Sequence, residues 1–169
     1  VFEDHIKGGV IPSLFVKAVE KGINTATFGG RYGFPVVDVK VKLADGSFHD
    51  VDSSEMAFRV AAVNCFRDAE EKSVPRILEP VMKVEISVPE QYMGDVIGNL
   101  QSRRAEVEGY EDAAGGLRII KVSVPLSEMF GYMTSLRSQT QGRGTFTMEF
   151  SNYREIPDNI KKQKFGITF

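Results

Sequence analysis

The clearest hydrophobic pattern lies in the second half of the chain. Apolar residues alternate with polar ones in a predicted strand, at Met82, Val84, Ile86 and Val88. After Pro89 a helix is predicted, with one apolar face formed by Met93, Val96, Ile97 and Leu100. A hairpin over residues 105–124, a helix with Met129, Met133 and Leu136, and a strand with Phe146, Met148 and Phe150 complete the series. The order strand–helix–strand–strand–helix–strand predicts a ferredoxin-like βαββαβ fold.

An internal repeat supports this assignment. A shift of 36 residues places Ser87-Val88-Pro89 on Ser123-Val124-Pro125, and Leu100 on Leu136. We interpret the repeat as two equivalent packing roles, so it carries structural rather than functional weight.

The first half predicts two helices around a strand. Helical spacing of apolar residues predicts a helix over residues 12–28, and alternation predicts a strand over residues 37–43. Asp45-Gly46 then predicts a tight hairpin that returns over residues 48–51. A second helix is expected to about Lys72, with Asp52 and Ser53 as caps and an apolar face of Met56, Val60 and Val63 with Ala57 and Ala61.

Two prolines mark a stiff junction between these halves, at Val74-Pro75 and Glu79-Pro80. The chain is therefore predicted to be of the α+β class, with two α/β-sandwich modules over residues 1–77 and 78–157. Residues 158–169 lack a sustained pattern and are expected to form a C-terminal tail.

Charge and cysteine content exclude several classes of protein. Lys and Arg number 21 against 23 Asp and Glu, so the net charge of −2 does not favour a broad nucleic-acid or membrane surface. Any RNA contact would have to be local. The single Cys65 excludes an internal disulfide and a site with several thiolates, and no apolar run approaches the ~20 residues of a membrane-spanning helix.

No catalytic, cofactor or metal site is predicted. The glycines of residues 29–33 lack the Lys and Ser or Thr that complete a phosphate loop. His49, Asp50 and Ser53 do not converge as a triad, because neighbours on a strand point to opposite faces. Cys65 has no His nearby in the sequence.

Two polar segments are candidates for binding. The first, at the predicted hairpin, holds Asp45, Gly46, Ser47, His49 and Asp50, with an imidazole near an exposed tip. The second follows the last predicted helix and holds Arg137, Gln139, Thr140, Gln141 and Arg143, where glycines permit close approach and arginines suit phosphate. The alternatives, a solvated turn and an ordinary helix-to-strand loop, remain open on the local pattern.

Several runs over residues 1–157 resemble the C-terminal third of bacterial-type elongation factor G, a translational GTPase. They include residues 8–12, 33–38, 49–58, 93–98, 124–132 and 141–144 (GGVIP, GFPVVD, HDVDSSEMAF, MGDVIG, VPLSEMFGY and QGRG). The resemblance implies that residues 1–77 are an incomplete domain IV, similar to the second domain of ribosomal protein S-five. It implies that residues 78–157 are the ferredoxin-like domain V.

The resemblance also implies a function. The factor promotes GTP-dependent translocation of tRNA and mRNA, with the domain IV tip, including His49, in the small-subunit decoding region. Domain V contacts large-subunit ribosomal RNA near the stalk base. GTP and magnesium would belong to a domain absent from this sequence, so the fragment is expected to be no enzyme and to need no cofactor. A cytoplasmic location is expected, and a mitochondrial one stays open.

The resemblance further predicts that strands of domain IV precede Val1. Their absence would leave an open sheet edge, which allows a dimer. The alternatives are a ribosomal protection protein or another translational GTPase paralogue, and, from a different class, a ferredoxin-like regulatory module for small molecules. An RNA-recognition motif is disfavoured because residues 117–124 carry no stacking aromatic residue.

Overall fold

The chain folds into two compact units. The computed structural model describes residues 1–166, and these divide into unit 1 (Val1–Pro75) and unit 2 (from Arg76 onward). The boundary lies close to the one predicted between residues 77 and 78. Each unit is described by itself below.

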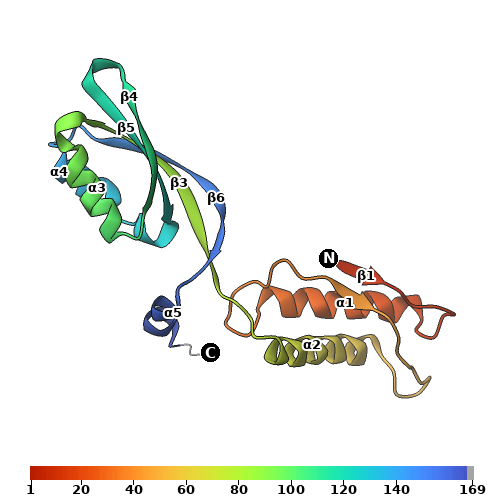
Figure 1. The fold of residues 1–169 in the computed structure, drawn as a ribbon. Helices are drawn as coiled ribbons and strands as arrows, with labels where there is room; N and C mark the ends of the chain where they lie inside the picture. The colour runs from red at the N-terminus through yellow and green to blue at the C-terminus, as the bar shows by residue number, and fades with distance from the viewer. Residues whose placement is uncertain (167–169) are drawn as a thin grey trace. The chain divides into compact units, whose positions relative to one another are not determined.

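Unit 1 consists of two helices packed against a small sheet (Figure 1). Its elements are β1 (Phe2–Asp4), α1 (Ser13–Phe28), β2 (Val41–Leu43) and α2 (Glu55–Lys72). β1 and β2 pair in parallel, with Phe2 opposite Val41. The helices lie side by side, and Gly22 of α1 permits the close approach because a Cβ there would lie 2.5 Å from the Arg59 carbonyl oxygen of α2.

The packed face of α2 differs from the predicted one. Met56 and Val60 are 67% and 48% exposed, and the buried cluster is instead joined by Phe58, Ala62 and Phe66. These three lie at i, i+4 and i+8 and so form one helical face. α2 carries two apolar stripes, and the one with a small central residue and two flanking rings fits the close crossing at Gly22. The predicted face was therefore wrong.

The predicted hairpin after residue 43 is also wrong. β2 covers only Val41–Leu43, and residues 44–49 form no strand. Two contacts explain this. Asp45 accepts a hydrogen bond from the N–H of Gly46 at 2.7 Å, and the Phe48 ring packs on Phe15 of α1 with centroids 6.2 Å apart. The segment is thus held against the helices and does not return along β2.

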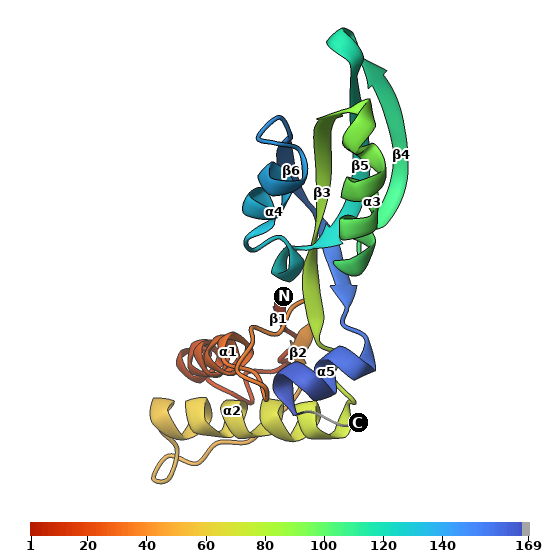
Figure 2. The ribbon, with the colours of Figure 1, turned by 90° about the vertical axis from the view of Figure 1, so that its left-hand side faces the viewer.

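Unit 2 has the predicted ferredoxin-like fold. Its strands are β3 (Leu78–Pro89), β4 (Glu106–Ala113), β5 (Leu117–Pro125) and β6 (Thr145–Glu155), in the antiparallel order β4-β5-β3-β6. The helices α3 (Met93–Ser102) and α4 (Tyr132–Gln139) lie on one face of this sheet (Figure 2). The core between the layers includes Val84, Ile86, Val88, Val96, Leu100, Ile120, Val122, Val124, Tyr132 and Leu136.

The 36-residue repeat is visible in this fold. β3 and β5 each end in proline, and each is followed by a 3₁₀ turn, Glu90–Tyr92 or Leu126–Glu128, before its helix. Leu100 and Leu136, which the repeat superposes, are both fully buried. The two halves therefore have the equivalent packing roles that the sequence indicated.

Residues after Pro157 form a helix that the sequence pattern did not predict, α5 (Asp158–Phe165). Lys161 is buried, and its ammonium donates to Glu155 at 2.7 Å and to Asp158 at 2.9 Å. Arg76 donates to the same Glu155 carboxylate at 2.8 Å. α5 is held by charged contacts rather than by an apolar stripe, which is why hydrophobic periodicity did not reveal it.

Candidate nucleic-acid interface

The candidate segment of unit 1, the tip loop (residues 44–53), is closed by a side chain of its own. The Ser53 hydroxyl accepts a hydrogen bond from the N–H of His49 at 2.9 Å, and the N–H of Ser53 donates to the His49 carbonyl at 3.1 Å. Ser53 therefore closes the loop like a clasp. The N-cap of α2 is the next residue, Ser54, whose hydroxyl accepts a hydrogen bond from the N–H of Ala57 at 3.1 Å. The clasp leaves the His49 and Asp50 side chains exposed.

Aromatic and close-packing contacts anchor the other side of the tip loop. The Phe48 ring packs on Phe15, which in turn stacks on Phe58 with centroids 4.6 Å apart. Gly46 lies against the loop that precedes α1, because a Cβ on Gly46 would be 2.5 Å from Cδ1 of Ile11. Among the predicted site residues, Gly46 thus positions the loop, whereas Asp45 and Ser47 are exposed.

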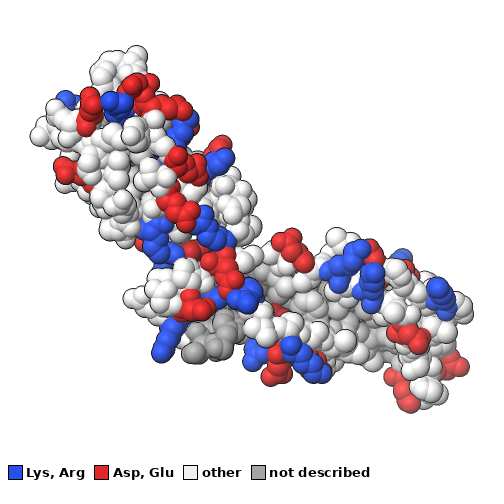
Figure 3. Space-filling view, viewed as in Figure 1, with Lys and Arg blue, Asp and Glu red and all other residues white. Residues whose placement is uncertain are grey.

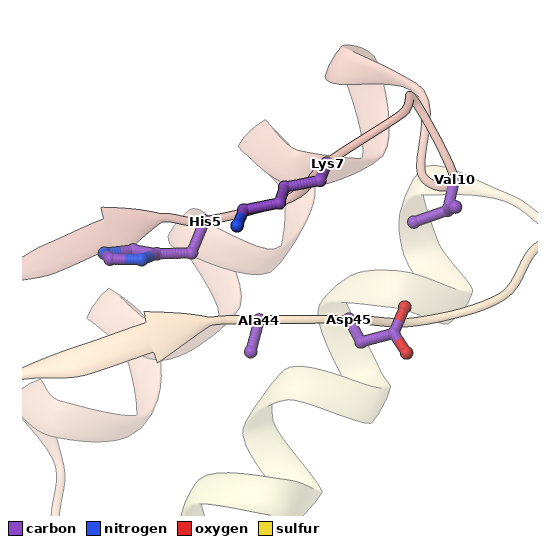
Figure 4. Close-up of a pocket in the computed structure, with 5 residues that line it drawn as sticks. All are labelled: His5, Lys7, Val10, Ala44 and Asp45. Carbon is purple, nitrogen blue, oxygen red and sulfur yellow. The ribbon is translucent and has the colours of Figure 1, made fainter.

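A second loop of unit 1 borders the tip loop, and sequence reasoning did not assign it a role. His5, Lys7, Val10, Ala44 and Asp45 line an open hollow of about 430 Å³ (Figure 4). Lys7 makes no ion pair with any residue that the structure describes. The chain turns after Lys7 at Gly8 and Gly9, which have φ values of +67° and +68°. In the sequence, this pair of glycines was the signal for a turn.

His5 belongs to a charged contact at the rim of this hollow. Its Nε2 lies 3.1 Å from a carboxylate oxygen of Glu3, and Lys40 lies 2.6 Å from the other oxygen. These hydrogen bonds, first from Lys40 and then from His5, lower the pKa of Glu3. The carboxylate thus stays ionised at neutral pH and is paired with the Lys40 ammonium and the His5 imidazole.

The candidate segment of unit 2 is tightly built; it comprises residues 137–144, which are the end of α4 and the connection to β6, and is called the α4–β6 loop. The Thr140 side chain is fully buried, and its hydroxyl donates to the Leu136 carbonyl at 2.7 Å and accepts from the N–H of Gly144 at 2.8 Å. A Cβ on Gly144 would lie 2.8 Å from Cγ of Leu136 and 2.8 Å from the hydroxyl oxygen of Thr140. The N–H of Gly142 donates to the Arg137 carbonyl at 2.8 Å. The loop therefore has one well-defined backbone path.

The predicted residues of this loop have different roles. Arg137, Gln141 and Arg143 are exposed. Thr140 has no free hydroxyl for a ligand, so the structure gives it a positioning role in place of the predicted RNA contact. Gln139 is partly buried, and among the described residues its Oε1 is buried with no hydrogen-bond partner.

Arg143 has a partner from another element, Tyr92, which sequence reasoning missed. Its guanidinium lies over the Tyr92 ring, 5.0 Å from the centroid, and donates a hydrogen bond to the phenol oxygen. Tyr92 ends the 3₁₀ turn before α3, 51 residues earlier in the chain. An aromatic residue just before a helix was the only local signal, and it does not indicate which loop lies beside it.

The charged surface is mixed rather than of one sign. Lys and Arg side chains are interspersed with Asp and Glu over each unit on the face shown in Figure 3. A search of residues 1–166 finds no group of three or more His, Cys, Asp or Glu placed to hold a metal ion. No helix in the same residues is long and apolar enough to span a membrane.

Comparisons with known proteins identify the family. The model described as "Elongation factor G, domain IV" matches residues 1–74, and "Elongation factor G C-terminus" matches residues 76–164. A crystal structure of a protein from Thermus thermophilus is similar, with 39% identity and a TM-score of 0.86. The match covers 96% of this chain and 24% of that one, so this chain spans about a quarter of its relative. The chain therefore belongs to the elongation factor G family, through domain IV in unit 1 and the C-terminal domain in unit 2.

Proposed function

We propose that this chain is the ribosome-binding part of a translation elongation factor that promotes translocation of tRNA and mRNA. In this proposal the tip loop of unit 1 enters the decoding region of the small subunit, and the α4–β6 loop of unit 2 contacts large-subunit ribosomal RNA. Both actions are binding and positioning, with nucleotide hydrolysis left to another domain of the factor. Such a role belongs to a compartment that holds ribosomes, the cytoplasm or the mitochondrion.

The observation that carries the proposal is the construction of the α4–β6 loop. It holds two exposed arginines and no acidic residue. Arg137 and Arg143 form no ion pair with a carboxylate in the part of the chain that the structure describes. Guanidinium groups on a fixed backbone suit bidentate contacts to phosphate, since little further ordering is needed on binding.

The tip loop supports the second half of the proposal. The Ser53 clasp and the Phe48 anchor fix its two sides, so His49 is presented on an ordered turn. An imidazole can donate a hydrogen bond to a phosphate or a base edge, and in its protonated form it adds a charge. His49 is therefore the side chain we expect to meet the codon–anticodon backbone.

Co-sedimentation with purified ribosomes across a salt series tests the RNA contact of unit 2. The chain should pellet in a salt-sensitive manner, and Arg137→Gln should reduce the slope of log affinity against log salt by about 1. Arg67→Gln is the matched control, because Arg67 is also exposed but lies on α2. A folded chain that shows no salt-sensitive pelleting would contradict the proposal.

Translocation kinetics test the tip. In a complete factor that carries this sequence, His49→Ala should slow single-round translocation by about tenfold, equivalent to ~1.4 kcal/mol of transition-state free energy. The Arg67→Gln control should translocate at the unchanged rate. An unchanged rate for His49→Ala would remove His49 from the mechanism.

A dimer through the sheet edge of unit 1 stays a prediction. In the described residues β1 and β2 form a two-stranded sheet, so each has a single neighbouring strand. Sedimentation equilibrium should then show a concentration-dependent dimer, and a monomer at all concentrations would contradict the idea.

A further inference from the structure

The contact between Tyr92 and Arg143 is built like a binding surface. The Arg143 guanidinium carbon lies 5.0 Å from the centroid of the Tyr92 ring, and the same guanidinium donates a hydrogen bond to the phenol oxygen, so two contacts hold it. Tyr92 is partly buried and Arg143 is exposed, so the ring backs the cation and leaves the cation facing solvent. An exposed guanidinium beside an aromatic ring can take a further planar group, because its delocalised plane stacks on flat partners.

The loop backbone supports the same placement. The N–H of Arg143 donates to the Thr140 carbonyl at 3.0 Å, and its neighbour Gly144 is buried against Leu136. Gln141 and Gly142 adopt left-handed φ values of +52° and +79°, which bend the chain sharply between α4 and Arg143. Main chain and side chain of Arg143 are thus both set before any ligand arrives, which lowers the entropic cost of binding.

Arg143 also differs from most other arginines of unit 2. Four other arginines of this unit donate to carboxylates, namely Arg76, Arg104, Arg118 and Arg154. Among the described residues Arg143 has an aromatic partner and no carboxylate partner. Its charge and four of its five N–H groups are therefore available to a ligand.

We propose that Tyr92 and Arg143 form a stacking platform for an unpaired RNA base. The base lies on the free face of the Arg143 guanidinium, and Tyr92 is the positioning residue behind it. Unstacked bases in RNA loops are commonly held on arginine planes and aromatic rings. This inference deepens the proposed function and rests on it, because it assigns this loop a base contact in addition to phosphate contacts.

The test uses ribosome co-sedimentation of the chain and two central variants. Arg143→Lys keeps the charge but removes the plane, and Tyr92→Leu removes the ring beneath it. Each should weaken binding about 5- to 150-fold, the range expected for one stacked base, with the salt slope of the unchanged chain. Tyr92→Phe keeps the ring and should recover most of the affinity.

Two controls separate stacking from loss of structure. Tyr110→Leu removes a 61% exposed tyrosine from β4 of the same unit and should bind like the unchanged chain. Circular dichroism and the thermal midpoint establish that each variant is folded. Dimethyl sulfate modification of the bound ribosomal RNA provides a second readout. The unchanged chain should alter the reactivity of an unpaired base, and Arg143→Lys should restore the reactivity of the free ribosome at that base alone.

The outcomes are distinct. Unchanged affinity for Arg143→Lys would mean that charge alone acts, which overturns the stacking platform and leaves the phosphate contact in place. Unchanged affinity for Tyr92→Leu would overturn the positioning role of Tyr92. Absence of salt-sensitive binding by the folded, unchanged chain would overturn the proposed function and this inference with it.

Discussion

Replacing Tyr132 with Phe should stabilise unit 2. The Tyr132 ring is fully buried between α4 and the sheet, with Phe146 at a centroid distance of 5.3 Å and the Arg103 guanidinium 5.2 Å above it. Its hydroxyl is also buried, and within residues 1–166 it has no hydrogen-bond partner. Tyr132→Phe keeps the ring and both ring contacts and removes only this unsatisfied group.

The expected gain is about 1 kcal/mol. A buried polar group without a partner costs about 1–3 kcal/mol, and the small void left by the oxygen offsets part of the gain. For a unit of this size, ~1 kcal/mol corresponds to a rise of about 4–8 °C in thermal midpoint. Urea unfolding followed by circular dichroism measures the change, with Tyr110→Phe on the exposed face of β4 as the neutral control.

Alkaline pH provides an independent measurement. Burial raises the pKa of Tyr132 from 10.0 to about 12, a change that the nearby Arg103 only partly opposes. The folded state then holds a proton that the unfolded state releases. The associated stability is complete below pH 10 and is lost as the pH rises from 10 to about 12, by roughly 3 kcal/mol. Tyr132→Phe should lack this loss, whereas Tyr110→Phe should retain it.

A destabilisation of 1 kcal/mol or more by Tyr132→Phe at neutral pH would refute the reasoning. It would mean that the hydroxyl makes a favourable hydrogen bond in the folded state, for example to an internal water. If the unchanged chain and Tyr132→Phe lost the same amount of stability as the pH rises above 10, the pKa argument would be refuted separately.

Three further predictions concern single contacts. Arg104→Ala removes a guanidinium that donates to Glu79 at 2.7 and 2.9 Å. Because the Glu79 side chain is only 9% exposed, its charge would be left buried without a partner, and urea unfolding should show a free energy of unfolding lower by about 3 kcal/mol. Equal stability of the two proteins would contradict this. Gly144→Ala forces a Cβ to within 2.8 Å of the buried Leu136 side chain, so we expect the free energy of unfolding to fall by about 2 kcal/mol and the chain to pellet more weakly with ribosomes. Full affinity for ribosomes would show that binding tolerates a shift of the loop backbone. Lys161 is the largest cause of a lowered pKa at Glu155, so the stabilising contribution of this carboxylate is present above its ordinary pKa of 4.5 and is lost as the pH falls through the lowered value. Amide hydrogen exchange of α5 should therefore differ between the unchanged chain and Glu155→Gln at pH 7 and converge in acid; equal exchange at pH 7 would contradict this.

The ferredoxin-like part of unit 2 could be predicted almost completely from its sequence because its local signals agree with one another. From Val84 to Val88 the buried residues of β3 alternate with more exposed ones, and both β3 and β5, the strands before α3 and α4, end in proline. α3 has a narrow apolar stripe in which Val96 and Leu100 are fully buried. When period, turn chemistry and repeat all support one arrangement, few alternatives remain.

Unit 1 was harder to predict because its deciding contacts are long-range. α2 offers two apolar stripes, and the stripe that packs is the one beside Gly22 of α1. Asp45-Gly46 has the sequence of a hairpin turn, yet the contact of Phe48 with Phe15 directs the chain elsewhere. Neither the glycine nor the distant ring is visible in a window of residues around the motif, so tertiary packing overrode the local preference.

The candidate sites show the same limit. The sequence predicted an exposed tip at His49, and the structure leaves His49, Arg137 and Arg143 exposed, while their RNA contacts stay predictions. What could not be predicted was the support beneath them, such as the Tyr92 ring, because the partner is far away in sequence. A loop's composition indicates what it can bind, and its distant contacts decide how firmly the binding group is held.

The two halves of unit 2 have equivalent backbone elements but differ in the connection that follows each helix. After α3, the chain continues through Arg103 and Arg104, and both guanidinium groups turn inward. Arg103 donates to the Glu128 carbonyl at 2.6 Å, and Arg104 to the Glu79 carboxylate. This first helix-to-strand connection therefore ties the helical layer to the start of β3, and its charges are used inside the unit.

After α4, the repeat places Gln139 and Thr140 at the positions of Arg103 and Arg104. Thr140 closes the second connection with neutral hydrogen bonds to the backbone, so no carboxylate is needed there. The arginines of this connection lie at other positions and remain exposed. The first connection is thus tied by an internal ion pair, whereas the second is closed by a buried hydroxyl and leaves its arginines exposed for the RNA contact that we propose. Thr140→Arg should disrupt the close packing of Gly144, and under this proposal it should also weaken the pelleting of the chain with ribosomes.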